Sequence, residues 1–378
     1  HLRRAGPSLL GHHRSELLID CWIRTRKRPQ NWGGGATCRP FSLRRIASAR
    51  PVDLVCNGVT HRPMAETDHP TPPPHRVIIA GASGTIGRAV VREFVARGAA
   101  VTALLRPQGK AGRVLPELAG AHGITVALDD AAGLAAAFAE AKPEVVISCI
   151  ASRSGGPKDA DKVDRRANLA LLAAAKGVGA QHFILLSAIC VQKPLLAFQH
   201  AKLAFEAELR GSGMDYTIVR PTAFFKSLSG QLKRVKRGKP FLIFGDGELT
   251  RCKPISDDDL ARFIADCAAD PARRNAILPI GGPGPAISLR EQGAMIFALL
   301  GKEPRYKSVS PGLFTKAEKL LALGAGWSDW FAEKAEYARI ARYYATESML
   351  VLDPATGTYS ADLTPEYGSE TLRDHYAK

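Results

Sequence analysis

The sequence lacks the features that would mark it as a membrane-spanning, disulfide-rich or metal-binding protein. It has no run of eighteen or more apolar residues, whereas a helix needs about 20 to cross a bilayer. Its seven cysteines include no C-x-x-C pair, and no cysteine–histidine spacing fits a zinc site, so neither a disulfide framework nor a metal site is indicated. These absences favour a globular protein of a reducing compartment. Peripheral contact with a membrane stays open.

Positive charge is concentrated at one end of the chain. The formal net charge is +16, but residues 1–63 hold 12 Lys and Arg against three acids, whereas residues 64–378 hold 40 against 33. The larger part is therefore only mildly basic, which argues against nucleic-acid binding. Residues 1–63 also show no hydrophobic periodicity, and we expect no folded module there.

Two interpretations of this N-terminal segment compete. It is either an organelle-targeting extension or an upstream reading frame joined to a gene that starts at Met64. We favour the second, because the segment contains only four serines and transit peptides are rich in serine. A linker over 66–74 follows, and its three successive prolines forbid a helix. We expect residues 1–74 to be unstructured.

From residue 75, apolar runs of strand length alternate with helical segments. We expect strands at 75–80, 101–106, 125–128, 145–151, 182–187 and 216–220, and helices at 88–97, near 115, and at 131–141, 164–176 and 198–210. Such alternation predicts a doubly wound parallel sheet of the Rossmann type over 75–221. The pattern is irregular afterwards, so 222–378 is expected to form a smaller substrate-binding region.

A glycine-rich turn lies between the first predicted strand and the first predicted helix. It reads Gly81-Ala82-Ser83-Gly84-Thr85-Ile86-Gly87. One glycine permits a tight turn, one lets the backbone approach a pyrophosphate, and one lets the helix pack on the strand, while N–H groups at the helix N-terminus attract phosphate. The expected dinucleotide contacts are Gly81, Ser83, Gly84, Thr85, Ile86 and Gly87.

The end of the second predicted strand distinguishes NAD from NADP. An acidic residue there binds the adenosine ribose of NAD, and a basic residue binds the extra phosphate of NADP. The residue is Arg106, and Lys110 and Arg113 follow in the same loop. Their charge favours NADPH, against the alternative of a solvated surface arginine.

Two more cofactor contacts are expected from topology. Asp129, just after the third predicted strand, is placed to bind the adenine amino group, although an N-cap role explains it equally well. Ala151 begins a loop over 151–156 that should pass beneath the nicotinamide ribose.

The glycine turn, the strand ending at Ser187 and the turn Val219-Arg220-Pro221 resemble the short-chain dehydrogenase/reductase superfamily, in its extended or atypical branch, over about 75–285. That superfamily uses Tyr-x-x-x-Lys with an upstream serine. Here the segment reads Phe198-Gln199-His200-Ala201-Lys202. Phenylalanine has no proton to give, so carbonyl chemistry run by the usual tyrosine is excluded. The resemblance implies that Lys202 binds the nicotinamide ribose. Ser187 orients substrate or cofactor, or is merely structural.

Longer blocks resemble a narrower family, the NADPH-dependent divinyl chlorophyllide 8-vinyl reductases. They are 186–194, 220–228, 244–247, 252–256 and 343–354. The resemblance implies that NADPH reduces a vinyl group conjugated to a magnesium tetrapyrrole, a reaction that requires no tyrosine aimed at a carbonyl oxygen. Apolar walls and a few cations would suit this flat substrate.

The same resemblance suggests substrate contacts after the last core strand. Phe224 and Phe225 could stack on the macrocycle, with core packing as the alternative. Lys226 could pair with the propionate group. Trp327 and Trp330 are expected to pack inside the protein rather than touch a membrane.

Three functions and two locations stay open at this point. The main hypothesis is 8-vinyl reduction in chlorophyll or bacteriochlorophyll synthesis. The alternatives are a non-catalytic NADP(H) sensor and a reductase of aromatic double bonds in phenolic substrates. We expect the cytoplasm of a photosynthetic bacterium, or a chloroplast if residues 1–63 form a transit peptide.

Overall fold

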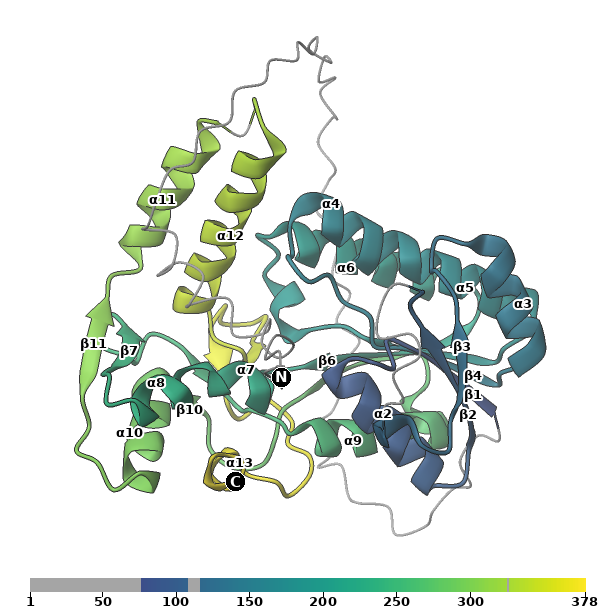
Figure 1. The fold of residues 1–378 in the computed structure, drawn as a ribbon, viewed down its shortest axis with the longest axis horizontal. Coiled ribbons are helices and arrows are strands. Elements are labelled where there is room, and N and C mark those ends of the chain that lie inside the picture. The colour runs from purple at the N-terminus through teal and green to yellow at the C-terminus, as the bar shows by residue number, and fades with distance from the viewer. Residues whose placement is uncertain (1–75, 108–115, 325) are drawn as a thin grey trace, which may run out of the picture. The chain divides into compact units, whose positions relative to one another are not determined.

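The computed structural model describes residues 76–107, 116–324 and 326–378, with a seven-stranded parallel sheet at the centre (Figure 1). Its strand order is β3-β2-β1-β4-β5-β6-β9. The strands are β1 (Arg76–Ala80), β2 (Ala100–Leu105), β3 (His122–Thr125), β4 (Val145–Ser148), β5 (His182–Leu186), β6 (Asp215–Pro221) and β9 (Ala276–Ile280). The order 3-2-1-4-5-6 is that of a doubly wound nucleotide-binding fold. The predicted fold class is confirmed.

Helices cover both faces of this sheet. One face carries α2 (Thr85–Ala96) and α9 (Asp257–Ala269), and the other carries α3 (Ala131–Ala141), α5 (Asn168–Gly177) and α6 (Ala197–Arg210). Alternate residues of β1 serve the two faces, because successive side chains of a strand point in opposite directions. Val77 and Ile79 enter the core beneath α2 and α9, while Ile78 enters the core on the opposite face.

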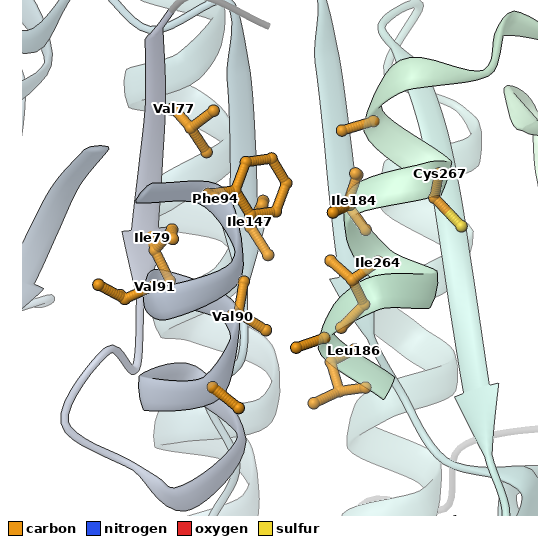
Figure 2. Close-up of a cluster of buried hydrophobic side chains, with 14 of the residues drawn as sticks. Val77, Ile79, Val90, Val91, Phe94, Ile147, Ile184, Leu186, Ile264 and Cys267 are labelled. Atoms are coloured by element: carbon orange, nitrogen blue, oxygen red, sulfur yellow. The ribbon is translucent and has the colours of Figure 1, made fainter. Parts of the chain in front are cut away.

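Figure 2 shows the first of these cores. Val90, Val91 and Phe94 of α2 face the strands from one side, and Ile264 of α9 faces them from beside α2. All four side chains are fully buried. This packing fixes α2, and therefore the glycine turn that begins it, to the sheet.

Several boundaries differ from the predicted ones: β4, for example, ends at Ser148 rather than at residue 151. β3 begins at His122 rather than at residue 125, because it is an edge strand whose four residues are mostly exposed and carry no apolar run. The residues that suggested a later strand, Val126 and Leu128, enter the core from the loop that follows β3. Helix α2 begins at Thr85, three residues earlier than predicted, because the last part of the glycine turn is already helical.

The region after Pro221 contributes to the sheet as well as to its own core. β9 pairs in parallel with β6, and α9 packs on α2. The separate core contains Phe225, Val235, Phe241, Ile243, Ile296, Phe297, Leu372 and Tyr376. The remaining elements of this region are α7 (Phe225–Leu228), η4 (Ser229–Gln231), α8 (Leu232–Lys236), β7 (Phe241–Phe244), β8 (Arg251–Cys252), η5 (Pro271–Arg273), β10 (Ile287–Ser288), α10 (Leu289–Leu299), β11 (Tyr306–Val309), α11 (Gly312–Ala322), α12 (Asp329–Thr346), β12 (Val351–Leu352), β13 (Tyr359–Ser360) and α13 (Leu372–Ala377).

Four short helical turns complete the first part of the chain. They are η1 (Pro116–Leu118), α4 (Pro157–Ala160), η2 (Asp161–Ala167), which is a π-helix, and η3 (Ile189–Gln192). None of the described helices is both long and apolar enough to cross a membrane. The predicted packing of the two tryptophans is wrong, because Trp327, in the turn between α11 and α12, is 91% exposed and Trp330, in the first turn of α12, is 56% exposed.

Candidate functional site

The glycine turn has the geometry of a phosphate-binding loop. Gly81 has φ +81°, and a Cβ added to it would lie 2.8 Å from the carbonyl carbon and oxygen of Cys149. A Cβ on Gly87 would lie 2.1 Å from the Gly81 oxygen, much closer than real atoms approach. The Gly84 N–H donates to that same oxygen at 2.9 Å. Both flanking positions therefore require glycine, and the turn stays tight.

The N-terminus of α2 is prepared for an anion. Its N-cap residue is Gly84, which has no side chain to accept a hydrogen bond from the first N–H groups of the helix. The first turn also holds no acidic residue. Ser83 and Gly84 are exposed, and Thr85 and Ile86 are half-buried. Because N–H groups and the helix dipole point outward here, the pyrophosphate of a dinucleotide fits this position.

A lysine from the C-terminal region completes this end of the site. Lys226 Nζ, from α7, donates to Thr85 Oγ1 at 2.6 Å. The sequence assigned Lys226 to the substrate, but the structure places its ammonium beside the first residue of α2. Burial raises the pKa of the neighbouring Asp257 carboxyl, and the Lys226 charge partly offsets that rise. Sequence alone could not find this contact, because Thr85 and Lys226 lie far apart in the chain.

The adenosine end of the predicted site is exposed. Arg106 follows β2 directly, and no described residue forms a hydrogen bond or ion pair with it. Its guanidinium is therefore available to an anion. Lys110 and Arg113, predicted to assist it, lie outside the described residues.

Asp129 does not cap the following helix. The N-cap of α3 is its neighbour Asp130, whose side chain accepts from Gly133 N at 2.9 Å. Asp129 is exposed and pairs with Lys162 at 3.1 Å, an interaction that lowers the pKa of its carboxyl. The capping explanation is thus wrong for Asp129. This residue lies in the loop after β3, which is an edge strand of the sheet.

Lys202 lies in a buried ion pair next to the predicted nicotinamide loop. Its Nζ is 3.0 Å from Asp164 Oδ1, and the two side chains are 9% and 0% exposed. Ser152 N donates to the same oxygen at 3.4 Å. Asp164 thereby connects Lys202 to the loop that begins at Ala151. The Ala151 residue itself is exposed. Within the described part of the chain, Asp164 Oδ2 has no hydrogen-bond partner.

Asp164 is positioned by the π-helical turn η2. Asn168 Nδ2 donates to the Asp164 carbonyl oxygen at 2.9 Å, and Ser148 Oγ donates to Asn168 Oδ1 at 2.5 Å. The sequence predicted an ordinary helix from residue 164, because nothing in the pattern distinguishes a π-turn from an α-turn. Such turns occur frequently at functional sites.

Phe198 fills the position of the missing tyrosine with apolar contacts. It packs, partly buried, against a cluster of Cys190, Leu196, Ile340 and Tyr343. The Tyr343 hydroxyl, from α12, donates to the Cys190 carbonyl oxygen at 2.9 Å. The C-terminal region therefore packs against Phe198, a residue that supplies no hydroxyl group to this part of the site.

Ser187 is engaged in a buried network. Its Oγ donates to Glu206 Oε1 at 2.5 Å, and Arg220 forms an ion pair with the same carboxylate. Ser187 is buried. Its hydroxyl proton is therefore already used inside the protein, which favours a structural role.

The two phenylalanines after the sheet have different surroundings. Phe225 is buried in the C-terminal core, with its ring 5.4 Å from that of His375. Phe224 is half-buried and forms a single bridge with Ile255. Core packing therefore accounts for Phe225, and Phe224 is the more accessible aromatic side chain. The described residues contain no cluster of potential metal ligands.

Comparison with known proteins fits this geometry. A family described as NAD(P)H-binding matches residues 81–271, which confirms the predicted cofactor class. A divinyl chlorophyllide a 8-vinyl-reductase of Oryza sativa subsp. indica is 47% identical over 90% of this chain and 91% of its own length. The corresponding protein of Cucumis sativus is 49% identical over 80% of this chain and 75% of its own length.

The chain belongs to the divinyl chlorophyllide a 8-vinyl-reductase family. The resemblance proposed from the sequence blocks is thereby confirmed. A solved structure with a similar fold is the NADPH-dependent quinone oxidoreductase of Escherichia coli in complex with NADPH, at 19% identity and a TM-score of 0.58 over 80% of this chain and 98% of that one. At that identity the likeness concerns the fold alone.

The expected location was wrong. Both relatives of this vinyl-reductase family are named as chloroplastic plant proteins, which contradicts a bacterial cytoplasm. The expectation had relied on the scarcity of serine in residues 1–63, which is a weak compositional signal. Those residues lie outside the described part of the structure.

Proposed function

We propose that this protein reduces the 8-vinyl group of divinyl chlorophyllide a, or of divinyl protochlorophyllide a, to an ethyl group with NADPH, in chlorophyll synthesis. The observation that carries the proposal is its 47% identity, over nearly the whole chain, to a protein with that activity in its name. Phe198 agrees with it, because reduction of a carbon–carbon double bond needs no acid aimed at a carbonyl oxygen.

The reaction divides between cofactor and protein. When bound, NADPH would supply the hydride for one vinyl carbon and be oxidised to NADP+, and a proton taken up from solvent would complete the ethyl group. The protein binds and orients both partners. Lys202 holds the nicotinamide ribose, and its buried partner Asp164 keeps the lysine side chain in position.

The cofactor would occupy the carboxyl edge of the sheet. The turn from Gly81 to Gly87 and the N-terminus of α2 hold the pyrophosphate, and Lys226 adds a positive charge beside Thr85. Arg106 binds the extra phosphate that distinguishes NADPH, and Asp129 lies on the adenine side. We reassign Lys226 from the substrate to the cofactor on the basis of its contact with Thr85.

Substrate binding is proposed near the carboxyl end of β6, where Phe224 follows the strand and packs partly buried against the sheet core. Phe224 is the aromatic side chain proposed to contact the magnesium tetrapyrrole, because Phe225 belongs to the core. We also propose a chloroplast location, which follows from the names of the plant relatives.

The decisive experiment incubates the full chain with NADPH and divinyl chlorophyllide a. The Soret band should move to shorter wavelength as the vinyl becomes ethyl, with one NADPH oxidised per substrate. If the protein binds NADPH but reduces no tetrapyrrole, the sensor alternative is correct and the proposal is wrong. If it reduces a phenolic double bond instead, the third alternative is correct.

A lysine variant tests the cofactor assignment. Lys226→Ala should raise the KM for NADPH ten- to about a hundredfold, since a charge-assisted contact contributes about 1.5–3 kcal/mol, and should leave kcat nearly unchanged. Lys307→Ala, which removes an exposed lysine of β11, is the matched control. A rise in the KM for chlorophyllide alone would return Lys226 to the substrate.

A further inference from the structure

The hairpin of α11 and α12 exposes large apolar side chains to solvent. Leu320, Leu323, Trp327 and Trp330 are 71%, 77%, 91% and 56% exposed. Single exposed apolar residues are ordinary, but a group of this size gathered on one element marks an interaction surface. We call these four residues, with Leu313, the hairpin surface.

Helical spacing brings the leucines to one side of α11. Leu313, Leu320 and the C-cap residue Leu323 are separated by seven and three residues, so they lie on one side of the helix, and Trp327 lies in the turn that follows. A different side of α11 packs against the protein through the buried residue Phe314, whose ring lies 5.7 Å from that of Phe244. The exposed leucine face is therefore not the face that holds the helix to the protein.

The turn itself is well packed. A Cβ on Gly324 would lie 2.7 Å from the Phe331 ring, and the rings of Phe331 and Trp330 meet edge to face at 4.9 Å. Lys334 Nζ lies 5.9 Å from the Trp330 ring. The tip thus holds its aromatic side chains at its surface through defined contacts.

The charged residues of α11 indicate which kind of partner fits the hairpin surface. The exposed ionisable residues of α11 are Lys316 and Lys319, and neither has an ion-pair partner among the described residues. The one acid of α11, Glu318, is engaged by Arg339 and Arg342 at 3.0 and 3.3 Å. The exposed acids at the start of α12, Asp329 and Glu333, lie beside Lys158 of α4. The leucine side of α11 is thus flanked by these two lysines of its own helix, and an apolar surface of this kind next to tryptophans matches the boundary between lipid headgroups and acyl chains in an anionic membrane.

Helix α12 of the hairpin contacts the candidate site both at its first residue, beside the tip, and further along the helix. Asp329 pairs with Lys158 of α4 at 2.6 Å, and a Cβ on Gly155 would lie 3.0 Å from Ile340 of α12. Gly155 belongs to the loop predicted beneath the nicotinamide ribose. Helix α12, which carries part of the hairpin surface, therefore packs beside α4 and the loop that contains Gly155 (Figure 1).

We propose that the hairpin surface is a membrane-docking surface, which inserts its leucines and tryptophans into the interface of an anionic bilayer. Docking there would bring the site close to the phase in which an apolar macrocycle dissolves. That last consequence rests on the proposed function, whereas the docking itself does not.

Vesicle sedimentation of the full chain tests the proposal. Vesicles of phosphatidylcholine with about one third phosphatidylglycerol should retain the protein, and pure phosphatidylcholine should retain much less. The double variant Leu320→Glu/Leu323→Glu should lower the partition coefficient at least about tenfold, because each substitution replaces apolar contact with a charge. Leu249→Glu, at a 49% exposed leucine outside the hairpin, should leave it unchanged.

The lysines provide a second arm. Lys316→Glu/Lys319→Glu should remove the preference for anionic vesicles. Equal retention of the wild type and the leucine variant would overturn the proposal. So would a leucine variant that changes only the sedimentation coefficient of the free protein, since the surface would then join two copies of this chain.

Failure of the proposed function can be told apart from failure of docking. With chlorophyllide dispersed in detergent, the leucine variant should reduce substrate at the wild-type rate, while with chlorophyllide in vesicles it should be slower. Vesicle binding without any reduction would refute the vinyl-reductase activity and leave docking intact.

Discussion

Replacing Lys202 by methionine should both destabilise the protein and weaken NADPH binding. The ammonium and the Asp164 carboxylate are almost completely buried and 3.0 Å apart, and among the described residues the second carboxylate oxygen has no partner. Removing one member of a buried pair leaves an uncompensated charge, which costs roughly 3–5 kcal/mol. Lys202→Met should therefore lose about that much free energy of unfolding at pH 7. Urea unfolding of the wild type and of Lys202→Met at pH 7 measures this loss of stability.

A second substitution separates structure from cofactor binding. Lys202→Met/Asp164→Asn should recover most of the lost stability, because no buried charge remains, but should not recover NADPH affinity measured by fluorescence titration. A Lys202→Met variant that loses less than about 1 kcal/mol would refute the buried-pair argument. Full recovery of affinity in the double variant would show that Lys202 only neutralises Asp164.

Three further outcomes are expected. Arg106→Glu should weaken NADPH binding ten- to a hundredfold, since charge-assisted hydrogen bonds contribute about 1.5–3 kcal/mol, and leave NADH binding within a few-fold; equal losses for both cofactors would contradict the phosphate assignment. Gly87→Ala should lower NADPH affinity at least about tenfold, because the added Cβ would lie 2.1 Å from the Gly81 oxygen and the turn must move; Gly177→Ala, with nothing within 4 Å of its Cβ, is the control in the same titration. Burial lowers the pKa of His182 to about 4 from 6.5, so stability should be full above pH 6.5 and fall by about 3 kcal/mol as the pH approaches 4; urea unfolding of His182→Gln that shows the same slope would exclude this cause.

The sequence predicted the sheet where strands are apolar and buried. β1, β4 and β5 are apolar along most of their length and lie at the centre of the sheet. The predicted position of β3 was wrong by three residues, because an edge strand with exposed side chains has no run of apolar residues to mark it. β9 was not predicted at all, since it follows a region in which the regular alternation had ended.

The site could be predicted in its local part only. The glycine turn is one continuous segment whose spacing carries its chemistry. The contact of Lys226 with Thr85 and the pairing of Lys202 with Asp164 join residues distant in sequence, and the pattern of a single sequence offers no signal for either. Phe225 was ambiguous for a different reason: an apolar ring serves a core and a ligand equally well.

The π-helical turn η2 makes the site depend on a residue count as well as on residue types. A π-turn holds one residue more than an α-turn, and each residue of an α-helix advances the direction of its side chain by about 100°. Deleting one residue between Asp164 and α5, such as Arg165, should relax the turn to α-geometry and rotate Asp164 away from Lys202 while α5 stays in the core. The Lys202–Asp164 ion pair therefore depends on the direction in which the helix presents Asp164. A chain shortened by one residue could keep both side chains and still lose the contact between them.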